Sequence, residues 1–295
     1  MEILRTPDAR FENLPGWSFE PRYVEVDGLR IHHVDEGPAG APVVLLLHGE
    51  PTWAYLYRTM IPVIAGAGLR AVAIDFAGFG RSDKPSDGSW YTYRSHIDTI
   101  AGAIEAIGLR DITLFGQDWG GLVGLRVALE MEDRFSRLIA SNTFLPTGDP
   151  PPPEIWFMFR DMVANAEVFD VPRTIQAGTK MTLPDEVLAA YDAPFPDESF
   201  KVGARRFPQL VPAETGDPEG QRNAEAWKVL ETWEKPFLTL FGDSDPITRG
   251  GDRPFQKRVP GAAGQPHATI EGAGHFCQED AGATIASHIV DWLAG

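Results

Sequence analysis

Apolar and polar residues alternate along residues 21–37, PRYVEVDGLRIHHVDEG, on both sides of Asp27 and Gly28. Period two is the pattern of a half-buried strand, and an Asp-Gly pair between two such strands favours a tight turn. The pattern changes at residues 43–47, VVLLL, where five apolar residues follow one another. A short uninterrupted apolar run is typical of a strand covered on both faces. We therefore predict a hairpin followed by an interior strand of a parallel sheet.

Strand-like and helix-like patterns then alternate along the chain. Residues 69–80, LRAVAIDFAGFG, form an apolar run that ends in a glycine-rich turn. Residues 95–109 repeat isoleucine at helical intervals, and Gly108 suits the end of that helix. Further strands are predicted at 111–117, 134–144, 236–245 and 267–275, and further helices at 119–132 and 283–295. Strands that alternate with helices predict an α/β fold, a mostly parallel, doubly wound sheet with helices on both faces.

The alternation of strand-like and helix-like patterns stops between residues 145 and 227. It opens with LPTGDPPPP, which forms neither a regular helix nor an interior strand. Short amphipathic helical patterns follow, joined by proline and glycine, in IWFMFRDMVANA, LPDEVLAAYD and ESFKVGARRF. We therefore predict that residues 1–144 and 228–295 form the main α/β domain and that residues 145–227 form a helical cap inserted into it.

Charge and cysteine content exclude several classes of function. The chain has 295 residues and a formal net charge of −16, a field that repels phosphate backbones, and no basic run offsets it. We therefore expect no nucleic-acid binding. The single cysteine, Cys277, excludes an internal disulfide and a multi-cysteine zinc site, and we expect neither a metal nor a cofactor.

The hydropathy of the chain argues against a membrane protein. No apolar run approaches the 18 to 20 residues that span a bilayer, and the first residues carry charges in place of the apolar core of a secretory signal. We expect a soluble, cytoplasmic protein that is a monomer or a weak homo-oligomer.

The segment LFGQDWGG at residues 114–121 carries the strongest chemical signal. Gly116, Asp118 and Gly120 form the pattern G-x-D-x-G, which matches the G-x-S-x-G turn that presents a serine nucleophile between a strand and a helix. An aspartate at the start of a helix is ordinarily a cap. The flanking glycines, however, indicate a turn too tight for side chains, so we predict that Asp118 is a nucleophile.

Two further residues complete the order nucleophile, acid, histidine, which is the chain order of an α/β-hydrolase triad. His275 follows the last predicted strand in GAGHF, and we assign it as the catalytic base. The turn GDSD offers Asp243 and Asp245 as the acid, and we favour Asp245 because it stands three residues after Gly242. All of these residues follow strands, and ligands of open α/β sheets gather at the carboxyl ends of the strands.

Five segments together resemble the haloalkane dehalogenases of the α/β-hydrolase superfamily, in the branch that carries HGEP. They are LHGEPTWAYLYRTM, DFAGFGRSDKP, QDWGG, YDAPFPD and GAGHFCQED. The similarity covers nearly the whole chain and is weakest between residues 148 and 185. HG-x-P and DWGG are shared with epoxide hydrolases, whereas HGEPTW together with YDAPFPD is much narrower.

The resemblance implies a two-step displacement on a small halogenated hydrocarbon. The carboxylate of Asp118 attacks the carbon that bears the halogen and expels halide, which leaves an alkyl ester on the enzyme. His275, oriented by Asp245, then activates a water that hydrolyses the ester. The backbone N–H groups of Glu50 and Trp119 are expected to hold the oxyanion. A serine would form an ether here, with no carbonyl for water to attack.

The resemblance also implies a site for the departing halide. Trp119 follows the nucleophile and offers an indole N–H, a donor suited to an anion in an apolar pocket. Relatives take a second indole from the cap, commonly just before an arginine, but the matching residue here is Phe159, before Arg160. Two alternatives remain at this point: Trp156, one helical turn earlier, replaces it, or the halide is held in a different way.

Three other functions have to be weighed. An epoxide hydrolase uses the same aspartate but normally needs two cap tyrosines, and the predicted cap contains only Tyr191. A fluoroacetate-type dehalogenase needs arginines beside the nucleophile, where this chain has Trp119 and Gly120. A catalytically silent binding protein of the same fold would have lost part of the triad, and nothing is missing here.

Overall fold

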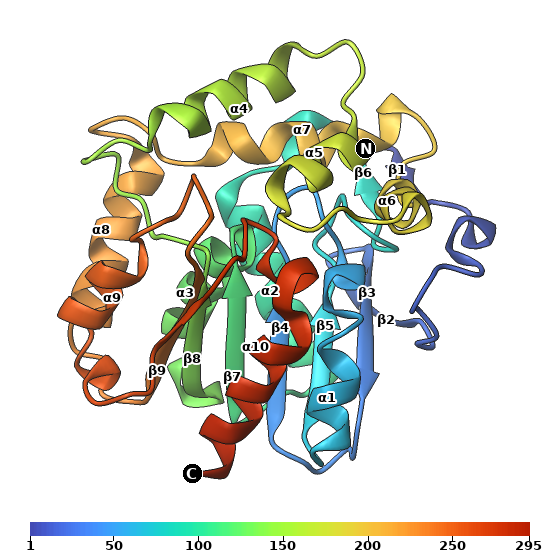
Figure 1. Cartoon of the computed structure of the whole chain (residues 1–295). Helices are drawn as coiled ribbons and strands as arrows, with labels where there is room; N and C mark the ends of the chain where they lie inside the picture. The colour runs from blue at the N-terminus through green and yellow to red at the C-terminus, as the bar shows by residue number, and fades with distance from the viewer.

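An eight-stranded sheet forms the centre of the molecule in the computed structural model, which describes residues 1–295 (Figure 1). Its strands are β2 (Arg22–Val26), β3 (Leu29–Glu36), β4 (Val43–Leu47), β5 (Arg70–Ile74), β7 (Ile112–Gln117), β8 (Phe135–Ser141), β9 (Phe237–Gly242) and β10 (Ala268–Ile270). Their order across the sheet is β10-β9-β8-β7-β4-β5-β3-β2. The pairs β2–β3 and β3–β5 are antiparallel and all other pairs are parallel, which confirms the predicted mostly parallel α/β sheet.

Helices cover both faces of this sheet. Helices α1 (Ile61–Gly66) and α10 (Cys277–Ala294) pack together on one face, and α2 (Tyr93–Ile107) and α3 (Trp119–Glu130) pack together on the other (Figure 1). The interior strands β4 and β7 are buried along their whole length, as their apolar runs predict. None of the helices combines the length and the apolar character that crossing a bilayer requires.

The hairpin and the first long helix confirm the predictions from local sequence. Asp27 and Gly28 join β2 to β3 with positive φ angles of 48° and 78°, the conformation that Asp-Gly turns favour. Helix α2 begins with a capping box in which Thr92 and Ser95 exchange side-chain to backbone hydrogen bonds, and it ends at Gly108, whose φ is 76°.

The last helix differs from its prediction. It begins at Cys277 and not near residue 283, and Ala281, with φ −149° and ψ 30°, interrupts its helical geometry. The first turn therefore carries Glu279 and Asp280 and lies directly after His275. Periodicity of apolar residues could not find this turn, because the interruption separates it from the amphipathic part of the helix.

Five helices lie between β8 and β9. They are α4 (Glu154–Asn165), α5 (Val171–Gly178), α6 (Asp185–Asp192), α7 (Val202–Arg206) and α8 (Pro218–Leu230). Helices α4 to α7 lie over the carboxyl ends of the parallel strands, whereas α8 descends beside the sheet and packs against α3 (Figure 1). The carboxyl ends of β4, β7, β9 and β10 thus face the layer formed by α4 to α7. A site can lie between the sheet and this layer of helices.

Candidate active site

Asp118 lies at the junction of β7 and α3 in a backbone conformation that side chains rarely adopt. Its φ is 51° and its ψ is −122°. A Cβ on Gly120 would lie 1.8 Å from the carbonyl oxygen of Leu47, and one on Gly116 would lie 2.7 Å from the carbonyl oxygen of Gly120. Both positions therefore require glycine, and the chain holds Asp118 in a strained turn of the kind found at functional sites.

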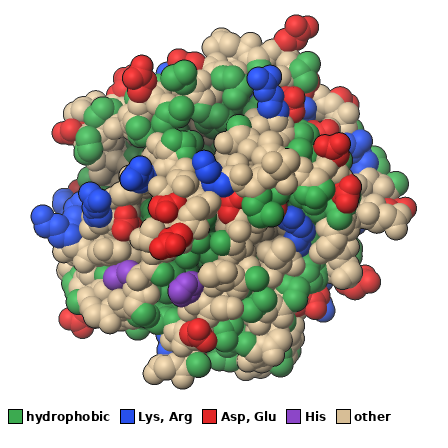
Figure 2. Space-filling view, viewed as in Figure 1, with side chains coloured by type: hydrophobic (Ala, Val, Ile, Leu, Met, Phe, Trp, Pro, Cys, Tyr) green, Lys and Arg blue, Asp and Glu red, His purple; other side chains and the backbone are tan.

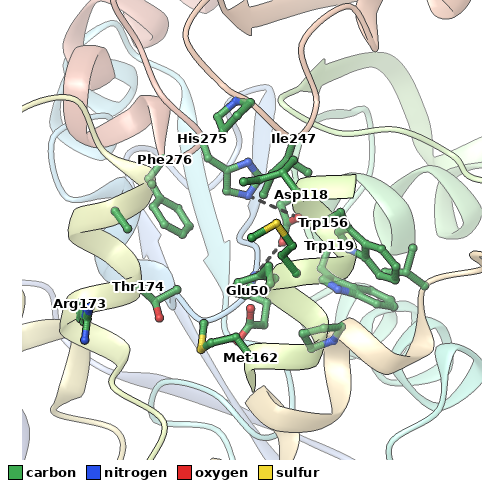
Figure 3. Close-up of a pocket in the computed structure, with 18 of the residues that line it drawn as sticks. Glu50, Asp118, Trp119, Trp156, Met162, Arg173, Thr174, Ile247, His275 and Phe276 are labelled. Carbon is green, nitrogen blue, oxygen red and sulfur yellow. Dashed lines mark hydrogen bonds and ion pairs between the residues drawn. The ribbon is translucent and has the colours of Figure 1, made fainter. Parts of the chain in front are cut away.

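The structure brings Asp118, His275 and Asp245 together from three separate loops. His275 Nε2 lies 3.5 Å from Asp118 Oδ2, and these two side chains face each other in Figure 3. His275 Nδ1 lies 2.9 Å from Asp245 Oδ2. The carboxylate of Asp245 also accepts hydrogen bonds from the backbone N–H of Ile247 and the hydroxyl of Thr248. The alternative acid, Asp243, bonds to Ser244 and Gly272 and does not contact His275.

The charges around His275 favour its protonated form. Burial disfavours the imidazolium, but the carboxylates of Asp245 and Asp118 outweigh burial and raise the pKa of His275 to about 10. Burial likewise opposes ionisation of Asp245, yet its bonds to His275, Thr248 and Ile247 lower the pKa of this carboxyl below its ordinary value. The resting site therefore holds an imidazolium between two carboxylates.

Backbone groups of the loop after β4 lie close to the carboxylate of Asp118. The N–H of Glu50 donates to Asp118 Oδ1 at 2.9 Å. A Cβ on Gly49 would lie 2.4 Å from that same oxygen, so glycine lets the loop approach the carboxylate closely. Trp119 is the first residue of α3, and the N–H groups of a first helical turn have no partner within the helix. The structure thus gives Oδ1 one backbone hydrogen bond, from Glu50, whereas the N–H of Trp119, expected as the second donor, makes no hydrogen bond to it.

The side chain of Glu50 is an unexpected feature of this loop. Both carboxyl oxygens are buried, and neither has a hydrogen-bond partner in the protein. Burial and the neighbouring charge of Asp118 raise the pKa of Glu50 well above its ordinary value. Burial and the charge of Asp118 therefore favour the neutral form of Glu50 over a second negative charge beside Asp118.

A cavity of about 620 Å³ opens above Asp118 (Figure 3). Most of its lining is hydrophobic, and α4 contributes the wall opposite the sheet. Three exposed side chains of α4, Ile155, Met158 and Met162, also line it. Hydrophobic side chains gather over this part of the molecule on the face shown in Figure 2. The cavity is therefore suited to an apolar molecule of modest size.

Two indoles line this cavity. Trp119 stacks on Phe207, with ring centroids 4.5 Å apart, and Trp156 reaches the cavity from α4 close to Trp119 (Figure 3). The indoles of Trp53, Trp227 and Trp292 donate to protein oxygens, whereas those of Trp119 and Trp156 do not. Phe159 lines the same cavity and carries no donor.

The sequence analysis missed two residues that support the triad. Asn142 directly follows β8. Its backbone carbonyl accepts from Asp118 N at 3.1 Å, and its side-chain oxygen accepts from Gly242 N at 2.7 Å. Its amide group donates to Gly274 O at 2.8 Å. Gln117 donates to His275 O at 3.1 Å. Asn142 thus joins all three loops of the triad, and its only signal in the sequence is a polar residue directly after a buried strand.

Comparison with known proteins gives one consistent family. A family model described as the alpha/beta hydrolase fold matches residues 42–281. The chain is 51% identical to a haloalkane dehalogenase of Psychrobacter cryohalolentis, over 99% of this chain and 98% of that protein. It is 50% identical to a haloalkane dehalogenase of Mycobacterium marinum, over 99% of this chain and 100% of that protein.

Solved structures agree with the sequence comparisons. The structure of the tetrameric haloalkane dehalogenase DpaA from Paraglaciecola agarilytica NO2 superposes with a TM-score of 0.91 at 36% identity, covering 100% of this chain and 99% of that one. These matches do not favour the epoxide hydrolase alternative. The chain belongs to the haloalkane dehalogenases of the α/β-hydrolase fold, hydrolases that act on carbon–halide bonds.

Proposed function

We propose that Asp118, His275 and Asp245 carry out the hydrolytic dehalogenation of this family as nucleophile, base and orienting acid. The observation that supports these roles best is the contact of His275 with both carboxylates, at 3.5 Å from Asp118 and 2.9 Å from Asp245, at the floor of an apolar cavity. Substrate, water and halide are the small-molecule partners, and no cofactor takes part.

The first step is a displacement at carbon. Asp118 Oδ2 forms a bond to the carbon that bears the halogen, and the carbon–halogen bond breaks with its electron pair going to halide. The reaction needs no base because the nucleophile is a carboxylate. The raised pKa of Glu50 favours its neutral form, which limits the negative charge beside Asp118 in an apolar cavity.

The second step hydrolyses the ester. Water adds to the carboxyl carbon of Asp118 while His275 Nε2 takes its proton, and the oxyanion forms on Oδ1, which already accepts from Glu50 N; we propose the N–H of Trp119 as its second donor in this step. The acyl carbon–oxygen bond then breaks, and the alcohol leaves with a proton. One alkyl halide and one water give one alcohol, one halide and one proton.

Alkylation itself prepares His275 for the second step. In the resting site, the charge of Asp118 is one of the two that raise the pKa of His275. Ester formation removes this charge, so the imidazolium loses part of its stabilisation and releases its proton more readily. The first step therefore produces the neutral base that the second step needs.

We assign halide binding to the indoles of Trp119 and Trp156. Both line the cavity, and neither donates to a protein acceptor, so both are free to donate to an anion. Phe159 stands where relatives place the second indole and contributes only apolar surface. The position of Trp156 on α4 makes the halide site depend on the cap.

We also propose that residues 145–227 act as the cap that covers the site, since α4 and α5 provide much of the cavity wall.

DpaA is described as tetrameric, whereas for this chain we propose a cytoplasmic monomer or weak homo-oligomer. Light scattering of the purified protein at micromolar concentration tests that state, and a stable tetramer would contradict it.

Activity on two substrates tests the function directly. We expect bromide release from 1-bromobutane and no diol from styrene oxide. Ring opening of an epoxide needs a proton donor in the pocket, and the hydroxyl of Tyr191, the single cap tyrosine, is buried and donates to Glu279. Diol formation without bromide release would contradict the proposed function.

A further inference from the structure

Asp280 joins the loop of the catalytic histidine to the cap. Its Oδ2 accepts the N–H of Gly274, the residue before His275, at 2.8 Å. Its Oδ1 accepts the N–H groups of Lys180 and Met181, which follow α5, at 2.9 and 2.8 Å. One carboxylate thus holds two segments that lie about a hundred residues apart in the sequence.

The two segments also touch directly. Phe276 N donates to Gly178 O at 3.1 Å. A Cβ on Gly178 would lie 2.5 Å from Phe276 Cε2, and a Cβ on Gly274 would lie 2.5 Å from Gly178 O. The backbone of the cap therefore rests on the backbone around His275 with no space between them. We call this contact, made by Gly178, Lys180, Met181, Gly274, Phe276 and Asp280, the clasp.

Asp280 is more than a charge that stabilises the start of a helix. An acidic residue in a first helical turn usually interacts with the N–H groups of that same turn. Here all three N–H donors lie outside α10, two of them in the cap and one beside His275. Its hydrogen bonds therefore fix the position of the His275 loop relative to the segment that follows α5.

The clasp supports His275 from the side that the main domain leaves free. Asn142 and Gln117 donate to the carbonyl groups of Gly274 and His275, which fixes the loop from the sheet. Asp280 accepts from the N–H of the same loop and ties it to the cap. Without Asp280, the loop keeps its attachment to the sheet and loses the carboxylate link to the cap, so that the bond from Phe276 N to Gly178 O is the hydrogen bond that still joins the two segments.

We propose that Asp280 is a positioning residue through which the cap holds His275 in place for ester hydrolysis. This inference rests on the proposed role of His275 as the base of the second step. The first step depends on Asp118, which Asp280 does not contact. The loss of Asp280 therefore slows hydrolysis of the alkyl-enzyme and leaves its formation unchanged.

The kinetic signature separates this role from a general loss of structure. Once halide has left, the alkyl-enzyme does not return to free substrate. The kcat/KM for halide release therefore reports only substrate binding and the first displacement. We expect Asp280→Ala to lower kcat and KM together and to keep kcat/KM within about twofold of the parent value. We expect the alkyl-enzyme to decay about 10-fold more slowly, less than the 100-fold loss that a 1 Å misplacement of a reacting group can cause.

The experiment follows the alkyl-enzyme by intact-protein mass spectrometry after rapid mixing with 1-bromobutane, for the parent protein, Asp280→Ala and Asp280→Glu. The longer carboxylate of Asp280→Glu retains its charge and is expected to restore part of the decay rate. Asp217→Ala is the matched control, because Asp217 also accepts two backbone N–H groups, those of Glu219 and Gly220, but lies away from His275. We expect it to lose stability without accumulating alkyl-enzyme.

Each outcome of the mass-spectrometry experiment either supports or overturns the positioning role of Asp280. An equal loss of formation and decay in Asp280→Ala, or accumulation in Asp217→Ala as well, would show that Asp280 has a structural role only. If Asp280→Ala does not fold, Asp280→Asn takes its place, since its amide group cannot accept from all three donors, and unchanged decay would overturn the proposal. Absence of any adduct on Asp118 in a variant lacking His275 would instead refute the proposed two-step function.

Discussion

At the scale of single residues, this active site works by controlling where negative charge is allowed. In the proposed mechanism Asp118 is an ionised nucleophile in an apolar cavity, and burial beside it raises the pKa of Glu50, which favours the neutral acid. Asp245 is ionised deep in the protein because His275, Thr248 and a backbone N–H compensate its burial. The same environment that would penalise a stray charge therefore strengthens the few interactions that catalysis uses.

Replacement of the base tests the order of the two steps. We expect His275→Phe to form the ester on Asp118 at close to the parent rate, since that step needs no base, and then to stop. Mass spectrometry after incubation with 1-bromobutane should show one butyl adduct on a peptide that contains Asp118. An unmodified protein would contradict the covalent route, and untreated His275→Phe serves as the control.

Halide affinity tests the assignment of the second indole. We expect Trp156→Phe to weaken bromide binding roughly 10-fold, the effect of one lost hydrogen bond to a charged group. Quenching of tryptophan fluorescence by bromide gives the dissociation constant. Phe159→Trp is the matched variant, because it adds an indole N–H to another residue that lines the same cavity, and it should tighten binding. Unchanged affinity in Trp156→Phe would mean that Trp119 binds halide without it.

At the scale of elements, local signals set the ends of the helices that sequence patterns could find. Thr92 and Ser95 satisfy each other's backbone N–H at the start of α2, and Gly108 ends it in the left-handed conformation. Strand β4 needed no more than its five apolar residues to be recognised. These features depend on neighbours within a few residues, so they are visible without a structure.

The cap of α2 provides a stability prediction. We expect Thr92→Ala to lower the free energy of unfolding by about 1 kcal/mol, because the N–H of Ser95 loses its acceptor. Thr92→Ser keeps the hydroxyl and should stay within about 0.5 kcal/mol of the parent protein. Urea denaturation of the three proteins measures the difference. Equal losses in both variants would mean that the methyl group and not the hydroxyl stabilises the helix.

Other features of the site could not be predicted because they depend on contacts across the fold. Asp118, Asp245 and His275 follow strands and carry recognisable turns, so their convergence could be anticipated. Asn142 carries no motif, and Asp280 ends the segment GAGHFCQED, which gives no sign of its contacts with the cap; both roles arise only when loops that are far apart in sequence meet. The first turn of α10 was missed for a related reason, since contact with His275 and the cap, and not apolar periodicity, gives that turn its structure.

At the scale of the whole molecule, ionisable groups buried away from the active site set the response to acid. His33, His48 and His96 are buried, and burial lowers the pKa of all three, to about 4 for His33 and about 3 for His96. Folding keeps these residues neutral, whereas the unfolded chain protonates them near pH 6.5. The unfolded state therefore binds more protons, and the free energy of unfolding falls as the pH drops below about 6.5.

Glu50 acts in the opposite direction over part of this range. Its pKa is raised in the folded protein, so it releases a proton on unfolding above about pH 4.5. His33 and His96, with pKa values of about 4 and 3 in the folded protein, take up about two protons on unfolding at pH 5.5, while His48 and Glu50 contribute with opposite signs. Since each proton corresponds to about 1.4 kcal/mol per pH unit, we expect a loss of about 2 to 3 kcal/mol between pH 6 and pH 5. Urea denaturation at the two pH values measures it.

His96 allows the source of this acid sensitivity to be isolated. Neither ring nitrogen has a hydrogen-bond partner, and the imidazole packs edge-on against Phe76 and Phe207. We expect His96→Phe to remove about one of the protons taken up on unfolding, because the site favours an apolar ring and the replacement cannot titrate. The loss between pH 6 and pH 5 should then shrink by about 1.4 kcal/mol. A loss as large as that of the parent protein would show that His96 is already protonated in the folded state, and that the acid sensitivity arises elsewhere.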